Sequence, residues 1–255
     1  MKIDDILQPL SNMIKYDDKP VVIFSAMWPL LKATKIYDGD LGCRNLLDLI
    51  YKITDERILL MPTFARGFVN GICDLDNEPS QTGILTELFR KQNGVKRTIC
   101  PYFSFSFRGN NSSKLLNLKN KDAWGNGSLY EWMYKNDVHI VTIGVHPTHC
   151  SFTHYAEWLK KDKIFYRHNK TFSGNVIYKK KMMPYKTTLL VRDVNYKVRN
   201  DFLWLLDIFK KNGMQHAVIN GISISEISAR VKIDIVTDQI DKNPYALIKQ
   251  NDRFQ

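Results

Sequence analysis

The chain has 255 residues, and its 37 basic against 26 acidic side chains give a formal net charge of +11. A hydrophobic share of 44% and a charged share of 25% are ordinary for a globular protein and exclude an intrinsically disordered chain. The longest apolar runs are strand-sized and the first ten residues contain no apolar signal core, so the sequence predicts a cytoplasmic protein without a membrane span.

Hydrophobic periodicity predicts alternating helices and strands along the chain. In chain order we expect a helix at 4–13, a strand at 21–25, a helix at 45–52, a strand at 58–62, a helix at 82–91, a strand at 138–145, a helix at 153–160, a C-terminal β-hairpin at 174–194 that turns around Met183, Pro184 and Tyr185, and a helix at 201–211. Apolar strands separated by helices favour an α/β fold with a mostly buried sheet. Because no linker, repeat or low-complexity segment interrupts the pattern, we expect a single domain over residues 1–255.

The cysteines and the charge narrow the classes of partner. Four cysteines occur without CxxC spacing and are expected to be free buried thiols: Cys43, Cys73, Cys100 and Cys150. The excess of positive charge favours anionic partners, which include nucleic acids, acidic membrane surfaces and small phosphate-bearing ligands.

The densest group of reactive side chains follows the apolar strand at 138–145. It contains His146, His149, Cys150, Ser151, His154 and Glu157. Ligands of α/β proteins bind beyond the carboxyl ends of strands, so a site is expected here. In a helix that begins near residue 153, His154 and Glu157 would share one face, where the carboxylate could orient the imidazole as a general base.

Simpler interpretations of this group stay open. His154 and Glu157 could form a surface pair of little energetic weight. Ser151 could cap the helix or donate a hydrogen bond to an oxyanion. Zinc ligation by the three histidines and Cys150 matches no usual spacing, and neither Cys100 nor Cys150 lies in a recognised nucleophile motif.

A second stretch suggests a ligand cleft. The strand that ends in Pro62, Thr63 and Phe64 leads into a loop with Asp74, then a helix, then a basic and aromatic loop. Further on, the turn at 125–128 contains two glycines whose backbone N–H groups could approach a phosphate, although on this pattern alone a plain glycine-rich turn is the better explanation.

Taken together, these motifs resemble the aminoglycoside 3-N-acetyltransferase family. Five segments match the family pattern in order: Leu60–Phe64 (Leu-Met-Pro-Thr-Phe), Pro79–Arg90 (Pro-Ser-x-x-Gly-x-Leu-x-Glu-x-Phe-Arg), Arg97–Phe105, Gly125–Ser128 and Ser151–Glu157. Several motifs in order are far more specific than any one of them. Three positions depart from the pattern, with Cys100 in place of a histidine, Ser151 in place of a threonine, and only Ser25 kept from an early His-Ser-Ser-Leu.

The resemblance implies a three-layer α/β/α sandwich with a mixed sheet, an acyl-CoA donor such as acetyl-CoA, and no metal. It implies that His154 is the base, Glu157 its orienting carboxylate, and Ser151 a hydroxyl that faces the thioester. The residues that it assigns to the donor are Ser25, Thr63, Ser104, Gly127 and Ser128. Those that it assigns to the acceptor are Asp74, Glu87 and Cys100.

The net charge of the chain bears on the class of acceptor. A basic protein suits a phosphate-bearing substrate, so we expect a nucleotide-linked amino sugar of a surface polysaccharide first and an aminoglycoside second. A basic nucleic-acid-binding module remains a third, non-enzymatic alternative, since Tyr102, Phe103, Phe105 and Phe107 could stack on single strands. The sequence leaves open whether the chain forms a homodimer.

Overall fold

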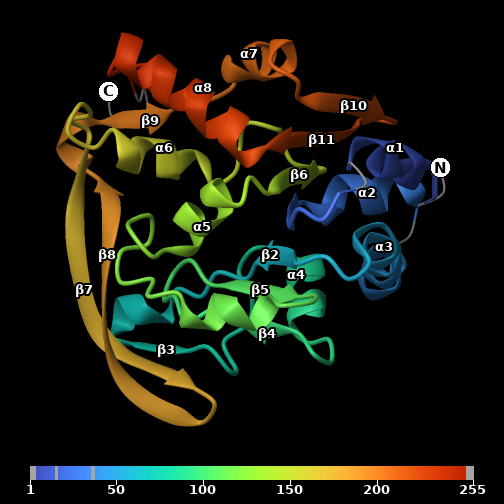
Figure 1. Cartoon of the computed structure of the whole chain (residues 1–255), viewed down its shortest axis with the longest axis horizontal. Coiled ribbons are helices and arrows are strands. Elements are labelled where there is room, and N and C mark those ends of the chain that lie inside the picture. The colour runs from blue at the N-terminus through green and yellow to red at the C-terminus, as the bar shows by residue number, and fades with distance from the viewer. Residues whose placement is uncertain (1–3, 15–16, 36–37, 251–255) are drawn as a thin grey trace.

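A mixed seven-stranded sheet forms the centre of the protein (Figure 1), in a computed structural model that describes residues 4–14, 17–35 and 38–250. Its strands lie in the order β10 (Gln215–Ile219), β11 (Ile222–Ser228), β6 (His139–Ile143), β1 (Val21–Ser25), β2 (Leu59–Pro62), β5 (Phe105–Arg108) and β4 (Lys96–Arg97). The three middle strands β6, β1 and β2 are parallel, and the strands on both sides are antiparallel to their neighbours.

Helices cover both faces of this sheet. One layer contains α1 (Asp4–Met13), α2 (Met27–Thr34), α3 (Gly39–Thr54) and α4 (Ile84–Arg90), and the other contains α5 (Leu129–Lys135), α6 (Thr153–Leu159), α7 (Leu205–Lys211) and α8 (Ala229–Lys242). Strand β1 serves both layers, because Val21 and Ile23 pack on the first while Val22 and Phe24 pack on the second. The predicted three-layer α/β/α sandwich is therefore confirmed.

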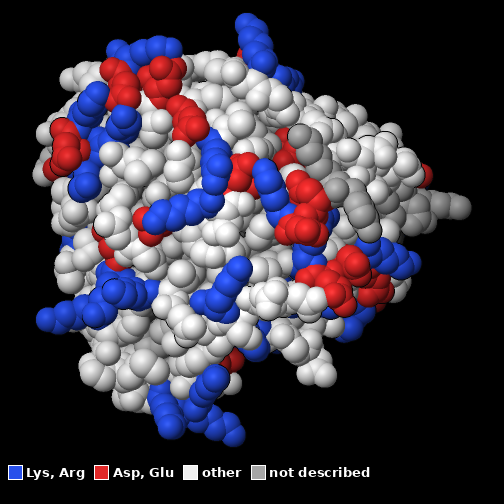
Figure 2. All heavy atoms as spheres, in the orientation of Figure 1, with Lys and Arg blue, Asp and Glu red and all other residues white. Residues whose placement is uncertain are grey.

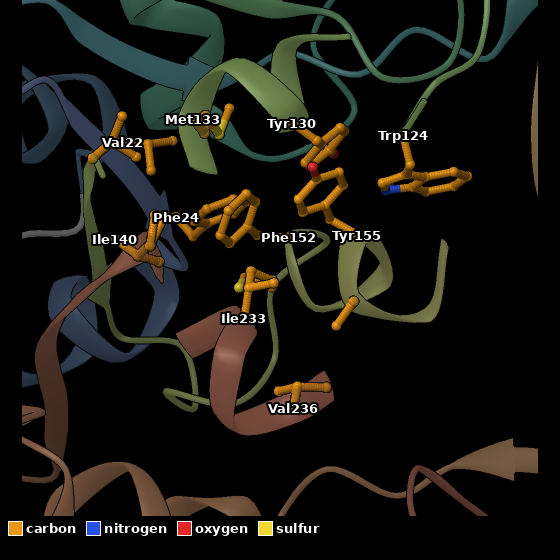
Figure 3. Close-up of a cluster of buried hydrophobic side chains, with 14 of the residues drawn as sticks. Val22, Phe24, Trp124, Tyr130, Met133, Ile140, Phe152, Tyr155, Ile233 and Val236 are labelled. Carbon is orange, nitrogen blue, oxygen red and sulfur yellow. The ribbon is translucent and has the colours of Figure 1, made fainter. Parts of the chain in front are cut away.

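The second layer is unusually aromatic beneath the segment that carries the predicted site. Tyr130 of α5 stacks on Phe152 with ring centroids 6.1 Å apart, and Phe152 stacks on Tyr155 of α6 at 6.0 Å. Figure 3 shows these rings in one buried cluster with Val22 of β1 and Ile233 of α8. This packing fixes α6 against the sheet.

A long hairpin of β7 (Arg167–Tyr178) and β8 (Lys181–Arg192) runs along one side of the molecule (Figure 1), and β3 (Ile72–Asp74) pairs with β7 in parallel. The hairpin itself is confirmed, but its predicted turn around Pro184 is wrong. The chain turns at Lys179 and Lys180, whose backbone N–H groups donate to the carboxylate of Asp76. Pro184 lies inside β8, an edge strand in which proline is tolerated.

Smaller elements complete the fold. A strand pair of β9 (Val198–Asn200) and β12 (Ile248–Gln250) lies beside the hairpin ends, and three 3-10 turns are η1 (Gly67–Asn70), η2 (Ser112–Asn117) and η3 (Val194–Tyr196). The predicted helix at 201–211 begins only at Leu205. No helix among the described residues has both the length and the apolar character that crossing a bilayer requires.

The aromatic run that could have stacked on single-stranded nucleic acid belongs mainly to the core. Phe105 and Phe107 of β5 are fully buried in the second layer, and the guanidinium of Arg108 lies 4.1 Å from the ring centre of Tyr51. Alternating aromatics in this strand therefore fill the interior and do not form a stacking surface.

Candidate functional site

The reactive group lies beyond the carboxyl ends of β1 and β6, as the sequence predicted. The chain leaves β6 through Gly144, whose φ of +69° is readily available only to glycine. A Cβ atom at this position would lie 2.3 Å from the carbonyl oxygen of Ala26, so a side chain would push the loop away from β1. Glycine thus lets the loop pass close to Ser25 before α6 begins.

His154 and Glu157 form a pair on the first turns of α6. His154 Nδ1 lies 2.5 Å from Glu157 Oε2, with the carboxylate fully buried. Arg167 Nε approaches the same oxygen at 2.9 Å, and the hydroxyl of Tyr166 donates to Oε1 at 2.9 Å. Burial alone would raise the pKa of Glu157, but the charges and hydrogen bonds of His154 and Arg167 outweigh it and lower that pKa to about 2.

This arrangement leaves one imidazole nitrogen for chemistry. Because Nδ1 faces Glu157, the neutral tautomer that donates to the carboxylate has its lone pair on Nε2. Within the described part of the chain, Nε2 has no hydrogen-bond partner, and the side chain is 21% exposed toward a cavity. The rings of Trp124 and Phe202 flank it, with centroid distances of 6.0 and 5.9 Å. His154 is therefore arranged as a general base.

The hydroxyl of Ser151 is oriented by a hydrogen bond from the protein interior. The hydroxyl of the fully buried Tyr130 donates to Ser151 Oγ at 2.8 Å. Helix α6 is preceded by Phe152 without a side-chain cap, so Ser151 does not act as its N-cap. Since Oγ accepts from Tyr130, its own hydrogen is available for donation to a substrate oxygen.

Two cavities meet at Ser151. The larger has a volume of about 580 Å³ and contains His154, whereas the smaller, of about 230 Å³, contains Ser25 and Thr82. Both are lined by Phe64, His149, Cys150 and Ser151. Two ligands could therefore approach the same hydroxyl from different sides, as a group transfer between them requires.

A third cavity is larger, at about 880 Å³, but lies before the amino ends of β1 and β2. Its lining is rich in carboxylates, including Asp17, Asp18, Asp55 and Glu56, and it contains no histidine. We assign the chemistry to the smaller pair of cavities because they contain a base with a free nitrogen.

Of the residues that the resemblance assigns to the donor, Ser25 lines the smaller cavity. Thr63 and Ser104 are fully buried and line neither cavity. Ser104 Oγ donates to the Thr63 carbonyl at 2.6 Å and accepts from Arg97 Nε at 3.0 Å. These two hydroxyl residues thus support the strands next to the site, and their contact with a donor stays a prediction.

Gly127 and Ser128 directly precede α5, and Ser128 is its N-cap. Ser128 Oγ accepts from the backbone N–H of Glu131 at 3.1 Å, while Glu131 Oε2 accepts from the N–H of Gly127 at 2.7 Å. This reciprocal pair resembles a capping box, in which orphan donors at a helix start are satisfied. Both groups are used inside the protein, and their assignment to the donor stays a prediction.

The three residues assigned to the acceptor lie outside both cavities. Asp74 accepts hydrogen bonds from Asp76 and Asn77 in its own loop. Glu87 pairs with Arg90 at 2.8 Å. Cys100 is 2% exposed, and burial raises the pKa of its thiol to about 12, which makes it a poor nucleophile.

The remaining alternatives for the histidine and cysteine group find little support. Among the described residues, no three His, Cys, Asp or Glu side chains are grouped to hold a metal ion. Cys150 lies beside Lys232, a fully buried lysine of α8 whose Nζ also donates to the carbonyl of Pro147 at 3.2 Å. Burial lowers the pKa of this lysine, and its contacts attach the loop before Ser151 to α8.

Sequence reasoning missed most of the larger cavity's wall. Besides His154 and Ser151, it is lined by aromatic side chains, by Asn200 and by three arginines, Arg66, Arg167 and Arg192. Arg167 and Arg192 are cross-strand partners at the open end of the β7–β8 hairpin. A correct turn position would have placed these two arginines opposite each other, because turn position sets the register.

A base, an oriented hydroxyl and two converging cavities on an α/β/α sandwich define a site for group transfer. Comparison with known families then identifies the chain, since residues 53–240 match the family described as aminoglycoside 3-N-acetyltransferase. The chain belongs to this family. It is an acyl-CoA-dependent N-acyltransferase with acetyl-CoA as co-substrate.

Solved structures share the fold at low sequence identity. The YokD protein from Bacillus subtilis is 16% identical with a TM-score of 0.71, covering 93% of this chain and 94% of its own. AAC-VIa bound to sisomicin is 16% identical with a TM-score of 0.76, covering 94% and 97%. AAC-IIIb in a binary complex with CoASH is 12% identical with a TM-score of 0.74, covering 94% and 96%. A search among curated proteins found no match.

Proposed function

We propose that the protein transfers the acetyl group of acetyl-CoA to a primary amine of a sugar-derived acceptor, with His154 as the general base. The observation that carries this proposal is the geometry of His154, whose Nδ1 is held by the buried Glu157 while Nε2 faces the larger cavity. The family membership supplies the donor.

The roles of the residues follow from their positions. The amine nitrogen of the acceptor attacks the thioester carbonyl while His154 Nε2 takes a proton from that amine. The same proton can then pass from His154 to the departing sulfur of CoA. Glu157 stays ionised and stabilises the imidazolium that forms in between. Ser151 donates its hydrogen to the developing oxyanion, with Tyr130 fixing its orientation. Ser25 and Thr82 contact the arm of the donor in the smaller cavity.

The family match supports an aminoglycoside acceptor better than the nucleotide-linked amino sugar that the net charge suggested. Sisomicin is the ligand of one structural neighbour, which makes this class of amine the natural first set of acceptors. Polysaccharide biosynthesis has no support from the comparisons.

The test is thiol release from acetyl-CoA in the presence of primary amines. Aminoglycosides such as sisomicin form one set, and simple amino sugars form another. We expect amine-dependent release by the wild-type protein and at least a hundredfold slower release by His154→Ala. Failure of every amine to accelerate release above the rate of hydrolysis, in protein that binds CoA, would refute the proposal.

A further inference from the structure

The wall of the larger cavity has a charge that is unusual for a site that receives amines. Arg66, Arg167 and Arg192 line it, and no Asp or Glu is among its lining residues in the described part of the chain. The one carboxylate behind it, Glu157, is fully buried and already held by His154 and Arg167. A polycationic amine would find no carboxylate here to neutralise it.

Carboxylates that are close in sequence are engaged elsewhere. Asp193 follows Arg192 but accepts from the backbone N–H of Asn195 at 2.9 Å. Asp201 follows Asn200 but pairs with Lys249 at 3.2 Å. Neither lines the cavity. The positive charge of the wall is therefore not offset from the neighbouring loop.

Two of the three arginines have no carboxylate partner. Arg167 is neutralised by Glu157. Arg192 donates only to neutral oxygens, to Asn200 Oδ1 at 2.8 Å and to the carbonyl of Val198 at 3.3 Å. Arg66 is exposed and makes no side-chain hydrogen bond or ion pair with the described residues. A guanidinium fork of this kind fits a phosphate or a carboxylate.

The rest of the wall suits the face of a ring. Tyr102, Phe103, Trp124 and Phe202 line the cavity together with apolar side chains of β8. A site with apolar walls and a few placed polar groups orients its ligand by those groups. In Figure 2, Lys and Arg side chains gather at the lower left, where the tip of the hairpin lies in Figure 1, whereas side chains of both signs lie near its open end. The preference for an anion therefore depends on the arginines of the cavity wall.

We infer that the acceptor is a ring-bearing primary amine that also carries a phosphate or carboxylate group, which Arg192 and Arg66 bind while the amine faces His154. The inference rests on the proposed function, because it names the class of amine for the same site. It concerns the charge of the acceptor alone, so the test is made with CoA already bound and its phosphates unable to account for added anion binding.

Calorimetric binding to the wild-type protein saturated with CoA tests this inference without turnover, because free CoA cannot acylate and already occupies the donor site. Glucosamine 6-phosphate represents amines with a phosphate, and muramic acid represents amines with a carboxylate. Glucosamine, which has the amine without an anionic group, is the control, and kanamycin represents the polycationic amines. We expect at least one of the two anionic sugars to bind about tenfold more tightly than glucosamine, since a charge-assisted hydrogen bond is worth that much.

Arg192→Gln should reduce this preference to about threefold or less. The control Arg44→Gln, which removes an exposed arginine of α3, should leave it unchanged. Equal affinities for the anionic and neutral sugars, no binding of either anionic sugar, or tighter binding of kanamycin would overturn the inference.

Thiol release with the same four amines separates this inference from the proposed function. Release with kanamycin alone would establish N-acetyl transfer and overturn the anionic acceptor. Selective binding of an anionic sugar without release by any amine would support the anion site and count against the transfer reaction.

Discussion

In the described part of the chain, two histidines are held by buried glutamates, and they differ in whether the second ring nitrogen has a partner. At the site, His154 gives Nδ1 to Glu157 and keeps Nε2 toward a cavity. His139, the first residue of β6, lies between two carboxylates. Its Nδ1 is 2.8 Å from Glu226 Oε1, and its Nε2 is 3.0 Å from Asp17 Oδ1. Its side chain is 5% exposed, and it lines none of the three cavities described above.

The difference distinguishes a catalytic base from a histidine that only stabilises the fold. Both imidazoles have a carboxylate that fixes their orientation, but only the first has an unoccupied nitrogen beside space for a ligand. Burial lowers the pKa of His139, yet the hydrogen bonds that the imidazole donates to Glu226 and Asp17 outweigh it and raise that pKa above its ordinary value. The second pair thus favours a charged imidazole that ties β6 to β11 and to the segment before β1.

The largest effect should follow the loss of the free nitrogen. His154→Ala is expected to lower kcat for acetyl transfer by about 10²–10⁴-fold, because it removes the imidazole that Glu157 orients toward the larger cavity. The affinity for CoA, measured by calorimetry, should change by less than about threefold. A variant with near-normal kcat would show that His154, like His139, has only a structural role.

The oxyanion donor should come next. Ser151→Ala is expected to lower kcat by about 10²-fold, in the range for loss of one such donor. Tyr130→Phe removes only the hydrogen bond that orients Ser151, so its effect should be roughly tenfold or less. A larger loss in Tyr130→Phe than in Ser151→Ala would reverse the roles assigned to these two hydroxyls.

Matched carboxylate variants compare the two pairs directly. Glu157→Gln should lower kcat about tenfold or more, because it removes the anion that stabilises the imidazolium and leaves Arg167 without its counter-charge. Glu226→Gln should leave kcat within about twofold while lowering the free energy of unfolding by about 1–3 kcal/mol. Denaturant unfolding and steady-state rates of both variants would check this. Equal kinetic losses would contradict the distinction.

The smallest effects are opposite pH dependences of stability. The pKa of Glu157 is lowered from 4.5 to about 2, so its contribution is complete above pH 4.5 and is lost as the pH falls toward 2. The pKa of His139 is raised from 6.5, so its contribution is complete below pH 6.5 and is lost as the pH rises through the raised value.

The free energy of unfolding, measured between pH 3 and 9 in Glu157→Gln and in Glu226→Gln, would separate the contribution of Glu157 from that of His139. Glu157→Gln should flatten the acid side of the stability profile, and Glu226→Gln should flatten the neutral to alkaline side. The same flattening in both variants would mean that the two pairs respond as one unit.

Local patterns were enough to predict the α/β class and the pairing of His154 with Glu157, while the three-layer sandwich and the role of the base came from the family resemblance. Apolar runs such as 21–25 and 138–145 become central strands, and the i, i+3 spacing of His154 and Glu157 gives the pair found on α6. Periodicity and short spacings are local properties of the chain, so sequence alone records them.

The remainder of the site depended on long-range contacts. Arg167 reaches Glu157 from the start of β7, and Tyr130 reaches Ser151 across the second helical layer. Asp74 and Glu87 were assigned to the acceptor through the resemblance, yet both serve local hydrogen bonds and ion pairs. Which carboxylates and arginines face a cavity is decided by packing between distant segments, which no short motif records.

The most direct test of the central claim is chemical rescue of His154→Ala by free imidazole, with the best acceptor from the thiol-release assay. We expect acetyl transfer by this variant to rise in proportion to imidazole concentration, because the vacated space beside Glu157 opens into a cavity of about 580 Å³. The wild-type rate should not respond. A variant whose rate stays unchanged at every imidazole concentration would contradict the claim that His154 acts as the base.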